Sequence, residues 1–431
     1  MEKGSAKANS GAAGFAGAVA AMKVPAYRDF TLGYTVAVIG TWLQRVVTGW
    51  LVWELTRSPG WLGALVFIDL LVTILTAPLA GAVADRASRL HVMIAAQSIL
   101  IVHAALMAVL YALGWLNIHA VLALAVVSGI GQGFHGAGRS SLLPGLVPKA
   151  LLAPAIGINA LTFNVARFIG PAIAGFIIST WGLPSAIGVN ALFCLPFIWV
   201  LSRLHLVTPD DMRKPAGGLL QQIGEGMDYA VRHPGIGPLI LIMGVTAFSV
   251  RALPDMLPGF AADVFGRGAS GLAWLTSSMG VGATVGGIMM ARRSGTQGMT
   301  RRLVGNFAVM TLAILAFVVS QTFWMGVASI VVVGYVLSTN GASSQTLIQS
   351  AVDGAMRGRV MSIYTLVYQG APALGGLILG NLAVHIGLRG AFAGGAAICA
   401  LACLWMWRHH GAMGAALEIP EQGADARKAA E

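Results

Sequence analysis

Five charged side chains stand inside long apolar stretches of the sequence. They are Arg45, Asp69, Arg167, Arg251 and Asp255. In a membrane-spanning helix each charge costs about 2.5–3.5 kcal/mol on insertion scales, so such residues pair with one another or mark a path for a solute or a proton. Carboxylates take up and release protons, and guanidinium groups bind anions. Three readings are therefore open for this set: structural ion pairs that lock helices together, coupling of a proton or solute to movement, and placement facing lipid or water.

The spacing of these charges predicts possible pairs. Arg45 and Asp69 are equally far from the turn that joins their two segments, so they would lie at similar depth in a helical hairpin. Arg167 reaches about the same level and competes as a partner for Asp69. Arg251 and Asp255 are one helical turn apart and can pair within one helix. Arg251 also occupies roughly the place in the second half of the chain that Arg45 holds in the first.

Polar uncharged residues extend this set. Asn164 lies one turn before Arg167 and joins the coupling candidates. His103 is isolated in its apolar segment and is predicted to be a core residue. Four amides are predicted to line a central cavity, although such residues also hydrogen-bond neighbouring helices: Gln44, Gln132, Asn340 and Gln345.

The sequence offers no pattern for covalent or metal chemistry. Cys194, Cys399 and Cys403 all fall in apolar runs, without the spacing of a disulfide framework or a metal site. The phosphate-binding loop of ATP-driven proteins is absent from the sequence. We therefore predict no catalytic residue, no metal, no cofactor, no use of ATP and no enzymatic activity.

Composition points to a lipid environment. The chain has 431 residues, of which 57% are hydrophobic and 10% charged. Soluble domains carry roughly 25% charged residues, so the bilayer must be the solvent for much of this chain. The net charge is +11, but the basic residues stand singly between apolar runs rather than in one patch, which argues against nucleic acid as a partner.

Twelve apolar segments long enough to cross a bilayer follow one another, which predicts an all-α integral membrane protein of two pseudo-symmetric six-helix bundles. Their boundaries are approximately 31–55, 60–84, 91–113, 117–138, 153–180, 184–204, 236–262, 269–291, 302–321, 324–348, 360–385 and 388–408.

These segments divide the chain into five parts. Residues 1–29 are predicted to be a disordered cytoplasmic tail, and 409–431 a second cytoplasmic tail. The two bundles are 30–204 and 236–408, and a linker at 205–235 separates them.

The linker contains apolar residues at helical spacing among polar ones, which predicts an amphipathic helix. The apolar residues are Leu219, Ile223, Met227 and Val231. Such a helix can lie along the membrane surface or form a plain soluble connection.

Orientation follows from the basic residues. If the amino terminus is cytoplasmic, the inner loops and tails hold most of the 27 Lys and Arg, and the outer loops hold Arg57, Arg267 and Arg389. This asymmetry predicts that both termini are cytoplasmic.

A charged loop follows the second segment: Gly81-Ala-Val-Ala-Asp85-Arg86-Ala-Ser-Arg89. Charges packed this closely at a membrane exit sit in water on the cytoplasmic side.

A second motif repeats between the two halves. Gly170-Pro171-Ala-Ile-Ala174-Gly175 in segment five is echoed by Ala371-Pro372-Ala-Leu-Gly375-Gly376 in segment eleven. Small residues at this spacing let helices approach closely. The predicted packing residues are Gly170, Pro171, Gly175, Pro372, Gly375 and Gly376. A repeat of six helices is typical of transporters that rock two bundles about a central site.

Together these motifs resemble the major facilitator superfamily. The loop at 81–89 resembles its signature, and three further stretches resemble its transmembrane secretion effector branch, which includes enterobactin exporters and drug-efflux pumps. These stretches are Trp50 to Pro59, Asn164 to Gly175, and Arg357-Gly-Arg359-Val-Met361-Ser362. The Gly-Pro element also resembles the motif of proton-coupled antiporters.

The resemblance implies a cytoplasmic latch. Gly81 would let segment two approach segment eleven, and Asp85 would sit at the start of that segment or pair with Arg359 or Arg89. The implied latch residues are Gly81, Asp85, Arg86, Arg89, Asp353, Arg357 and Arg359. One departure concerns Gly129, which stands where many drug antiporters carry an arginine.

These observations favour a secondary active transporter in the bacterial cytoplasmic (inner) membrane, most simply a proton-coupled exporter of a small organic molecule such as a siderophore, drug or metabolite. Its partners would be the solute, the proton gradient and the lipid bilayer. An uptake carrier for a vitamin or nutrient on the same fold is the alternative, and a non-transporting membrane scaffold or sensor a more distant one.

Overall fold

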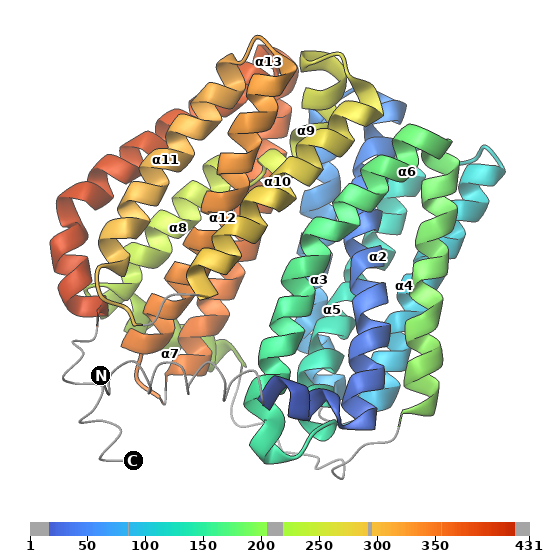
Figure 1. Ribbon diagram of the computed structural model, residues 1–431, viewed down its shortest axis with the longest axis horizontal. Helices are drawn as coiled ribbons and strands as arrows, with labels where there is room; N and C mark the ends of the chain where they lie inside the picture. Colours follow the sequence, from blue (N-terminus) through green and yellow to red (C-terminus); the bar gives the residue numbers. More distant parts are fainter. Residues whose placement is uncertain (1–16, 85, 205–218, 292–294, 355, 419–431) are drawn as a thin grey trace, which may run out of the picture. The chain divides into compact units, whose positions relative to one another are not determined.

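The structure is a computed structural model that describes residues 17–84, 86–204, 219–291, 295–354 and 356–418 (Figure 1). The regular elements in these ranges are helices. Ten of the helices described are long and apolar enough to cross a bilayer.

Two of these ten helices each contain two crossings. About 20 residues span the hydrocarbon core, whereas α6 (Leu152–Arg203) has 52 residues and α13 (Arg357–Leu417) has 61. Each turns back at one glycine with positive φ, Gly182 (81°) and Gly387 (75°), as Figure 1 shows. A residue with a Cβ is strained at such angles, so glycine permits both reversals. The described helices thus provide twelve crossings, which confirms the predicted count.

The chain divides into two compact units. The first unit is Met1–Thr48 with Leu71–Pro215, and the second is Gly49–Leu70 with Ala216–Glu431. The first unit contains α4, α5, α6, most of α2 and the second part of α3. The bounds of those not yet given are α2 Pro25–Thr56, α3 Pro59–Ala84, α4 Arg89–Ala112 and α5 Ile118–Leu142.

The first unit also holds the 3-10 turns η1 (Leu143–Gly145) and η2 (Lys149–Leu151), and the second unit holds the later elements. Their bounds are α7 Leu219–Arg232, α8 Ile236–Val250, α9 Leu253–Gly259, the π-helical turn η3 Phe260–Val264, α10 Gly268–Ala291, α11 Met299–Val319 and α12 Phe323–Ala351, followed by α13.

The hairpin between α2 and α3 belongs to the second unit because backbones meet there. A Cβ added to Gly63 would overlap the carbonyl oxygen of Gly376, and one added to Gly380 would lie 2.6 Å from the carbonyl oxygen of Pro59. Such contacts are open only to glycine, so this crossing depends on residue size rather than on polar bonds.

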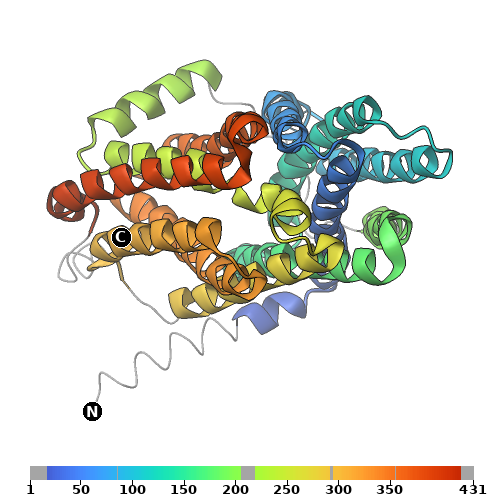
Figure 2. The same cartoon turned by 90° about the horizontal axis from the view of Figure 1, so that it is seen from above.

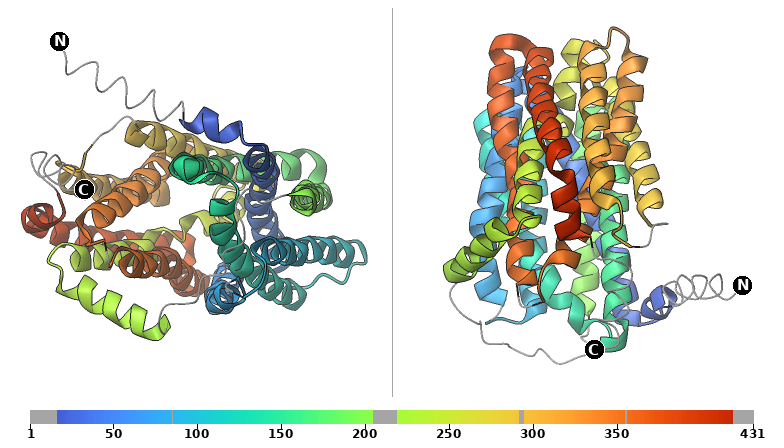
Figure 3. Two further views of the ribbon diagram at one scale, coloured as in Figure 1. Left: turned by 90° about the horizontal axis from the view of Figure 1, so that it is seen from below. Right: turned by 90° about the vertical axis from the view of Figure 1, so that its left-hand side faces the viewer.

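The predicted disordered tail at 1–29 is wrong for residues 17–29. Residues 17–22 form a helix that bends away from α2 (Figure 3), and α2 itself begins at Pro25. Ala21 and Tyr27 are fully buried in the core of the first unit. The Tyr27 hydroxyl donates a hydrogen bond to the carbonyl of Ala155 at 2.8 Å. Burial of these apolar side chains outweighs the glycine- and alanine-rich local composition; residues 1–16 lie outside the described part of the chain.

The predicted tail at 409–431 begins too early. Helix α13 continues to Leu417, and both Met413 and Leu417 are buried. The carboxylate of Glu418 then accepts hydrogen bonds from the backbone N–H groups of Gly298 (2.6 Å) and Thr300 (2.8 Å). A carboxylate at a helix start is favourable because the first N–H groups of α11 have no partner within the helix. Residues 419–431 lie outside the described ranges.

The predicted helix in the 205–235 linker is present as α7. It lies across one end of the spans of its own unit (Figure 1) and on their outer side (Figure 2). Ala230 is buried, whereas Met227 and Val231 are exposed. Since exposed apolar side chains on one face suit a membrane surface, this pattern is compatible with the interfacial alternative.

Candidate functional site

The seventh crossing is broken near its middle. Helix α8 ends at Val250, a turn holds Arg251 and Ala252, and α9 restarts at Leu253. Pro254 explains the break, because it has no N–H to give to the carbonyl four residues earlier and its ring clashes there. The crossing ends in the π-helical turn η3. Interrupted spans and π-turns both concentrate at binding sites of membrane transporters and enzymes.

Arg251 sits at this break against helix α13. Its Nη1 donates a hydrogen bond to the carbonyl of Tyr368 at 2.8 Å. Its guanidinium carbon lies 3.7 Å from the centre of the Tyr368 ring, which is a close cation–π contact. Tyr364, one turn earlier, stacks on Tyr368 with ring centres 5.4 Å apart and donates its hydroxyl proton to the carbonyl of Gly341 at 3.1 Å. Two stacked tyrosines thus fix the guanidinium in place.

A small cavity of about 20 Å³ opens beside Arg251. This is enough for one water molecule or one group of similar size. Its apolar wall is formed by Met243, Phe307, Met310 and Leu337, and the rest of its lining is Thr246, Arg251, Asn340, Gly341 and Tyr368.

Asn340 is the unusual member of this lining. Its side chain is only 5% exposed, and neither Oδ1 nor Nδ2 has a hydrogen-bond partner among the described residues. A buried amide without partners costs about 1–3 kcal/mol for each group left unsatisfied. An incoming polar group in the cavity would remove that cost.

The corresponding place in the first unit is built differently. Trp42 has Arg45 over its ring at 5.8 Å and Arg167 at 5.5 Å, so one indole receives two guanidinium groups. Arg45 is exposed, and α2 runs through this region without a break. Asp69 is half-buried in the part of α3 that belongs to the second unit, and its pairing with Arg45 or Arg167 stays a prediction. The side chain of Asn164 lies outside the described part of the structure.

The predicted cavity amides are separated by the structure. Asn340 lines the cavity beside Arg251. Gln44 is engaged in the first unit, since its Nε2 donates to Thr48 Oγ1 at 2.8 Å and its Oε1 accepts from the amide of Asn190. This is the helix-to-helix bonding that amides commonly provide. Gln132 is half-buried and Gln345 is exposed. Asp255 lies in the first turn of α9.

Gly129 takes part in a close helix crossing. Its carbonyl accepts a hydrogen bond from Thr73 Oγ1 at 3.3 Å, and a Cβ added to the neighbouring Gly133 would overlap the hydroxyl of Thr76. The threonine face of α3 therefore packs on α5 in the first unit. Gly129 itself is buried in this helix.

The repeated Gly-Pro elements both pack backbones tightly. A Cβ added to Gly170 would lie 2.6 Å from the Cβ of Trp42 and 2.7 Å from the carbonyl oxygen of Ile39. One added to Gly375 would overlap the carbonyl oxygen of Phe248. Gly175 is buried, Pro171 and Pro372 are half-buried, and Gly376 meets the hairpin at Gly63. The repeat thus marks equivalent crossings of α6 on α2 and of α13 on α8.

The latch residues near α13 contact α7. Arg359 forms an ion pair with Glu225 of α7, with both side chains about one-third to two-fifths exposed. Asp85 lies outside the described residues, so its predicted placement at the start of segment eleven or its pairing with Arg359 or Arg89 stays a prediction; in the described part of the chain Arg359 is engaged by the linker helix. The hydroxyl of Tyr229 donates to Asp353 Oδ2 at 3.1 Å and accepts from the Asp353 N–H at 3.3 Å. Arg357 is exposed.

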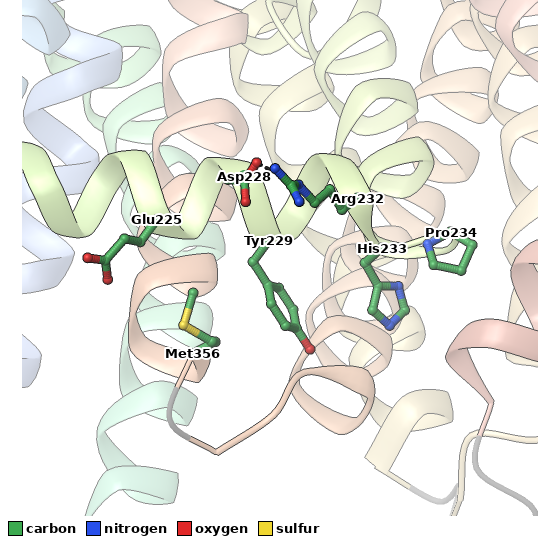
Figure 4. A pocket seen from close by; sticks show the side chains of 7 residues that line it. All are labelled: Glu225, Asp228, Tyr229, Arg232, His233, Pro234 and Met356. Atoms are coloured by element: carbon green, nitrogen blue, oxygen red, sulfur yellow. Dashed lines mark hydrogen bonds and ion pairs between the residues drawn. The ribbon is translucent and has the colours of Figure 1, made fainter.

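A surface groove of about 550 Å³ runs along this contact (Figure 4). Its lining is Glu225, Asp228, Tyr229, Arg232, His233, Pro234 and Met356. Figure 4 shows the Tyr229 ring extending from α7 toward the loop that precedes α13. The groove carries a paired acid and base, Asp228 and Arg232, one turn apart at 2.7 Å.

His233 closes the turn between α7 and α8. Its Nδ1 accepts hydrogen bonds from the N–H groups of Gly235 (3.1 Å) and Ile236 (3.2 Å), so this nitrogen carries no proton. Burial lowers the pKa of His233 below its ordinary value of 6.5, and the nearby carboxylate of Asp353 partly opposes that shift. Burial likewise raises the pKa of Tyr229, so its hydroxyl keeps its proton.

The other latch residues lie around the end of α3 and the start of α4. A Cβ added to Gly81 would meet no described atom within 4 Å, so no tight approach occurs at this glycine. Arg86 is exposed, and Arg89 begins α4. The implied latch at 81–89 stays a prediction.

Sequence reasoning missed three side chains that the structure brings to these sites. Tyr368 contacts Arg251, and Glu225 and Tyr229 hold the start of α13. The i,i+4 spacing of Tyr364 and Tyr368 was a visible signal of a shared aromatic face. The partners of the other two lie more than 120 residues away, so no local pattern announces them.

Comparison with known proteins agrees with this architecture. The sequence profile of the family described as transmembrane secretion effector matches residues 16–423. The staphyloferrin A transporter of Staphylococcus aureus is 24% identical over 362 residues, covering 81% of this chain and 87% of that protein. The enterobactin exporter EntS of Escherichia coli is 26% identical over 264 residues, covering 59% of this chain and 61% of that protein.

Solved structures share the fold at low sequence identity. A peptide transporter has a TM-score of 0.72 and 12% identity, covering 91% of this chain and 95% of that one. An inward-facing bacterial homologue of the iron transporter ferroportin has a TM-score of 0.68 and 16% identity, covering 89% and 98%. The protein is therefore a multi-pass membrane transporter of small molecules rather than an enzyme, and it belongs to the transmembrane secretion effector family of the major facilitator superfamily.

Proposed function

We propose that this transporter exports a small organic molecule from the bacterial cytoplasm in exchange for protons. The proposal places it in the inner membrane with both termini in the cytoplasm. The asymmetric basic residues support this orientation. The similarity to an enterobactin exporter and a staphyloferrin A transporter supports a siderophore or a related metabolite as the solute.

One observation carries the proposal: the broken seventh crossing that presents Arg251 and an unsatisfied Asn340 to a cavity. In a purely structural contact between helices the buried polar side chains are hydrogen-bonded to one another. A solute-binding site instead contains buried polar groups, here the amide of Asn340, that gain their hydrogen bonds when the solute binds. Arg251 would bind the solute in this scheme. The carboxylates of Asp69 and Asp255 are the groups we assign to proton exchange, because acids inside spans can load and release protons.

The contacts of α7 with α13 provide a clasp at the cytoplasmic end in this proposal. Glu225 and Tyr229 hold Arg359 and Asp353 next to the start of α13. These contacts are partly exposed and therefore individually weak, about 0–1 kcal/mol for the ion pair. Weak contacts suit a clasp that must open in each transport cycle. Gly81, Asp85, Arg86 and Arg89 would supply the second cytoplasmic contact.

Transport in vesicles tests the proposal. Inverted membrane vesicles with the full-length protein, given an inwardly acidic pH gradient, should accumulate labelled enterobactin or staphyloferrin A above vesicles that lack the protein. Collapse of the gradient with a protonophore should abolish the accumulation. Uptake confined to right-side-out vesicles would reverse the direction, and uptake that ignores the gradient would remove proton coupling.

A further inference from the structure

The cavity at the break of the seventh crossing has the donors of an anion site. Arg251 supplies a guanidinium whose planar N–H groups match a carboxylate. Asn340 supplies a buried amide whose Nδ2 has two N–H donors and no described partner. Thr246 gives its hydroxyl proton to the carbonyl of Ile242 at 2.8 Å, so it adds no competing donor. The cavity lining thus brings the guanidinium of Arg251, from the turn before α9, together with the amide of Asn340 from α12, beside Tyr368.

The walls of the cavity limit what this anion can be. Met243, Phe307, Met310 and Leu337 are apolar, and the free space of about 20 Å³ takes one small group rather than a whole solute. A strongly hydrated inorganic ion would lose its water shell against these walls. An organic carboxylate loses less, because its hydrocarbon part is favoured by the apolar wall.

Tyr368 prepares Arg251 for this role. The Tyr368 ring lies against the guanidinium of Arg251, and the Tyr368 carbonyl accepts a hydrogen bond from Nη1. Together these two contacts fix the plane of the guanidinium. A guanidinium fixed in advance loses less side-chain freedom on binding, which favours affinity. Gly341 keeps the tyrosine in position, since a Cβ there would lie 2.5 Å from the Tyr368 hydroxyl.

We propose that this cavity binds the carboxylate group of the transported molecule, held between Arg251 and Asn340. The inference rests on the proposed transport function, because it names the part of the solute that the second unit recognises. The solute class is therefore an organic carboxylate with an apolar or aromatic portion.

Binding of a small probe pair tests this assignment. Benzoate and benzamide have the same shape, but only benzoate carries the anion. Full-length protein in nanodiscs should bind benzoate at least about tenfold more tightly than benzamide by saturation-transfer NMR titration. Arg251→Lys keeps the charge but loses the planar fork, and it should weaken benzoate binding about tenfold. Equal binding of the two probes would overturn the proposal.

Asn340→Leu separates a ligand role from a structural role. Leucine matches the branched shape of asparagine and removes the unsatisfied amide, so the unliganded variant should melt at or above the wild-type temperature. Its affinity for benzoate should nevertheless fall about fivefold or more. The matched control is Asn381→Leu, an exposed amide that bonds its own helix at Leu377, and benzoate affinity should not change. Wild-type benzoate affinity in Asn340→Leu would contradict the site.

The two proposals can fail separately. Benzoate binding that follows this variant series, together with an absence of proton-driven transport, would retain the carboxylate site and reject the transport scheme. Conversely, the protein could carry out proton-driven transport that benzoate does not inhibit and bind benzoate no more tightly than benzamide. That result would retain the transport scheme and reject the carboxylate site.

Discussion

The two units carry an arginine at corresponding places, yet surround it differently. In the first unit Arg45 is exposed on the unbroken helix α2 and contacts Trp42 at 5.8 Å. In the second unit Arg251 is half-buried at a break and lies 3.7 Å from the Tyr368 ring. The charge is kept in both halves, and in the second half a small cavity lies beside it.

One residue accounts for much of this difference. Three positions after the arginine stands Thr48 in the first unit and Pro254 in the second. Thr48 continues the helix and receives a hydrogen bond from Gln44. Pro254 interrupts it, because it has no N–H to donate to the carbonyl of Val250. In a fold with two repeated halves, one broken helix can therefore adapt one half for binding. The matching helix of the other half remains unbroken.

The largest expected effect comes from removing each arginine in turn. Arg251→Ala should lower transport at least about 100-fold, because it removes both a half-buried charge-assisted donor and its stacking. Arg45→Ala removes an exposed cation–π contact worth about 0.5–1 kcal/mol and should lower transport less than about fivefold. Initial rates in inverted vesicles, corrected for protein level, give the comparison. Equal losses in both variants would mean that the two halves contribute alike.

The repeated glycines give an intermediate effect. Gly375→Ala and Gly170→Ala should each destabilise the protein by about 1–3 kcal/mol through overpacking, with Gly375→Ala the worse of the two. A Cβ at position 375 meets a backbone carbonyl more closely than one at position 170 does. Thermal unfolding in detergent measures both, and Gly81→Ala is the matched control because its surroundings are open. A larger loss for Gly81→Ala would contradict the packing described here.

The smallest expected effect concerns the starts of two helices, α2 in the first unit and α8 in the second. The entry to α2 is held by Tyr27, and phenols do not titrate near neutrality. The entry to α8 is held by neutral His233, whose pKa is lowered by burial. A base with a lowered pKa stabilises the folded state fully above its ordinary value of 6.5 and loses this contribution as pH falls through the folded-state value.

Hydrogen exchange measured from pH 7 to pH 4, with rates corrected for intrinsic pH dependence, checks this. Protection of the amides of Gly235 and Ile236 should fall on acidification, and that near Tyr27 should not. His233→Asn keeps an acceptor without a titrating proton and should flatten the response. Unchanged protection at Ile236 in the wild type would disprove the role of the histidine.

Much of the fold follows directly from the sequence. Apolar runs of bilayer length predict the twelve crossings, and the Gly-Pro repeat predicts two equivalent packing points. These features depend on neighbouring residues or on regular spacing, so they can be recognised in the amino-acid sequence. The helices at 17–29 and 409–417 were not predicted, because Tyr27 and Leu417 are held by tertiary burial rather than by local pattern.

The site was only partly predictable for the same reason. Arg251 and Asn340 stand out singly as polar residues in apolar runs. Their meeting at one cavity depends on three helices that lie far apart in sequence, and Tyr368 is 117 residues from Arg251. The ion pair of Arg359 with Glu225 was not predicted, because charge spacing gives the position of a residue along the chain but not the helix that folds against it.

The most direct test is to locate a bound carboxylate. Cryo-electron microscopy of the full-length transporter with 4-iodobenzoate, whose iodine gives strong density, would show where the probe sits. Our account predicts the carboxylate between the guanidinium of Arg251 and the amide of Asn340, over the break before Pro254. Density against Trp42, between Arg45 and Arg167, with an empty cavity at Asn340 would contradict it.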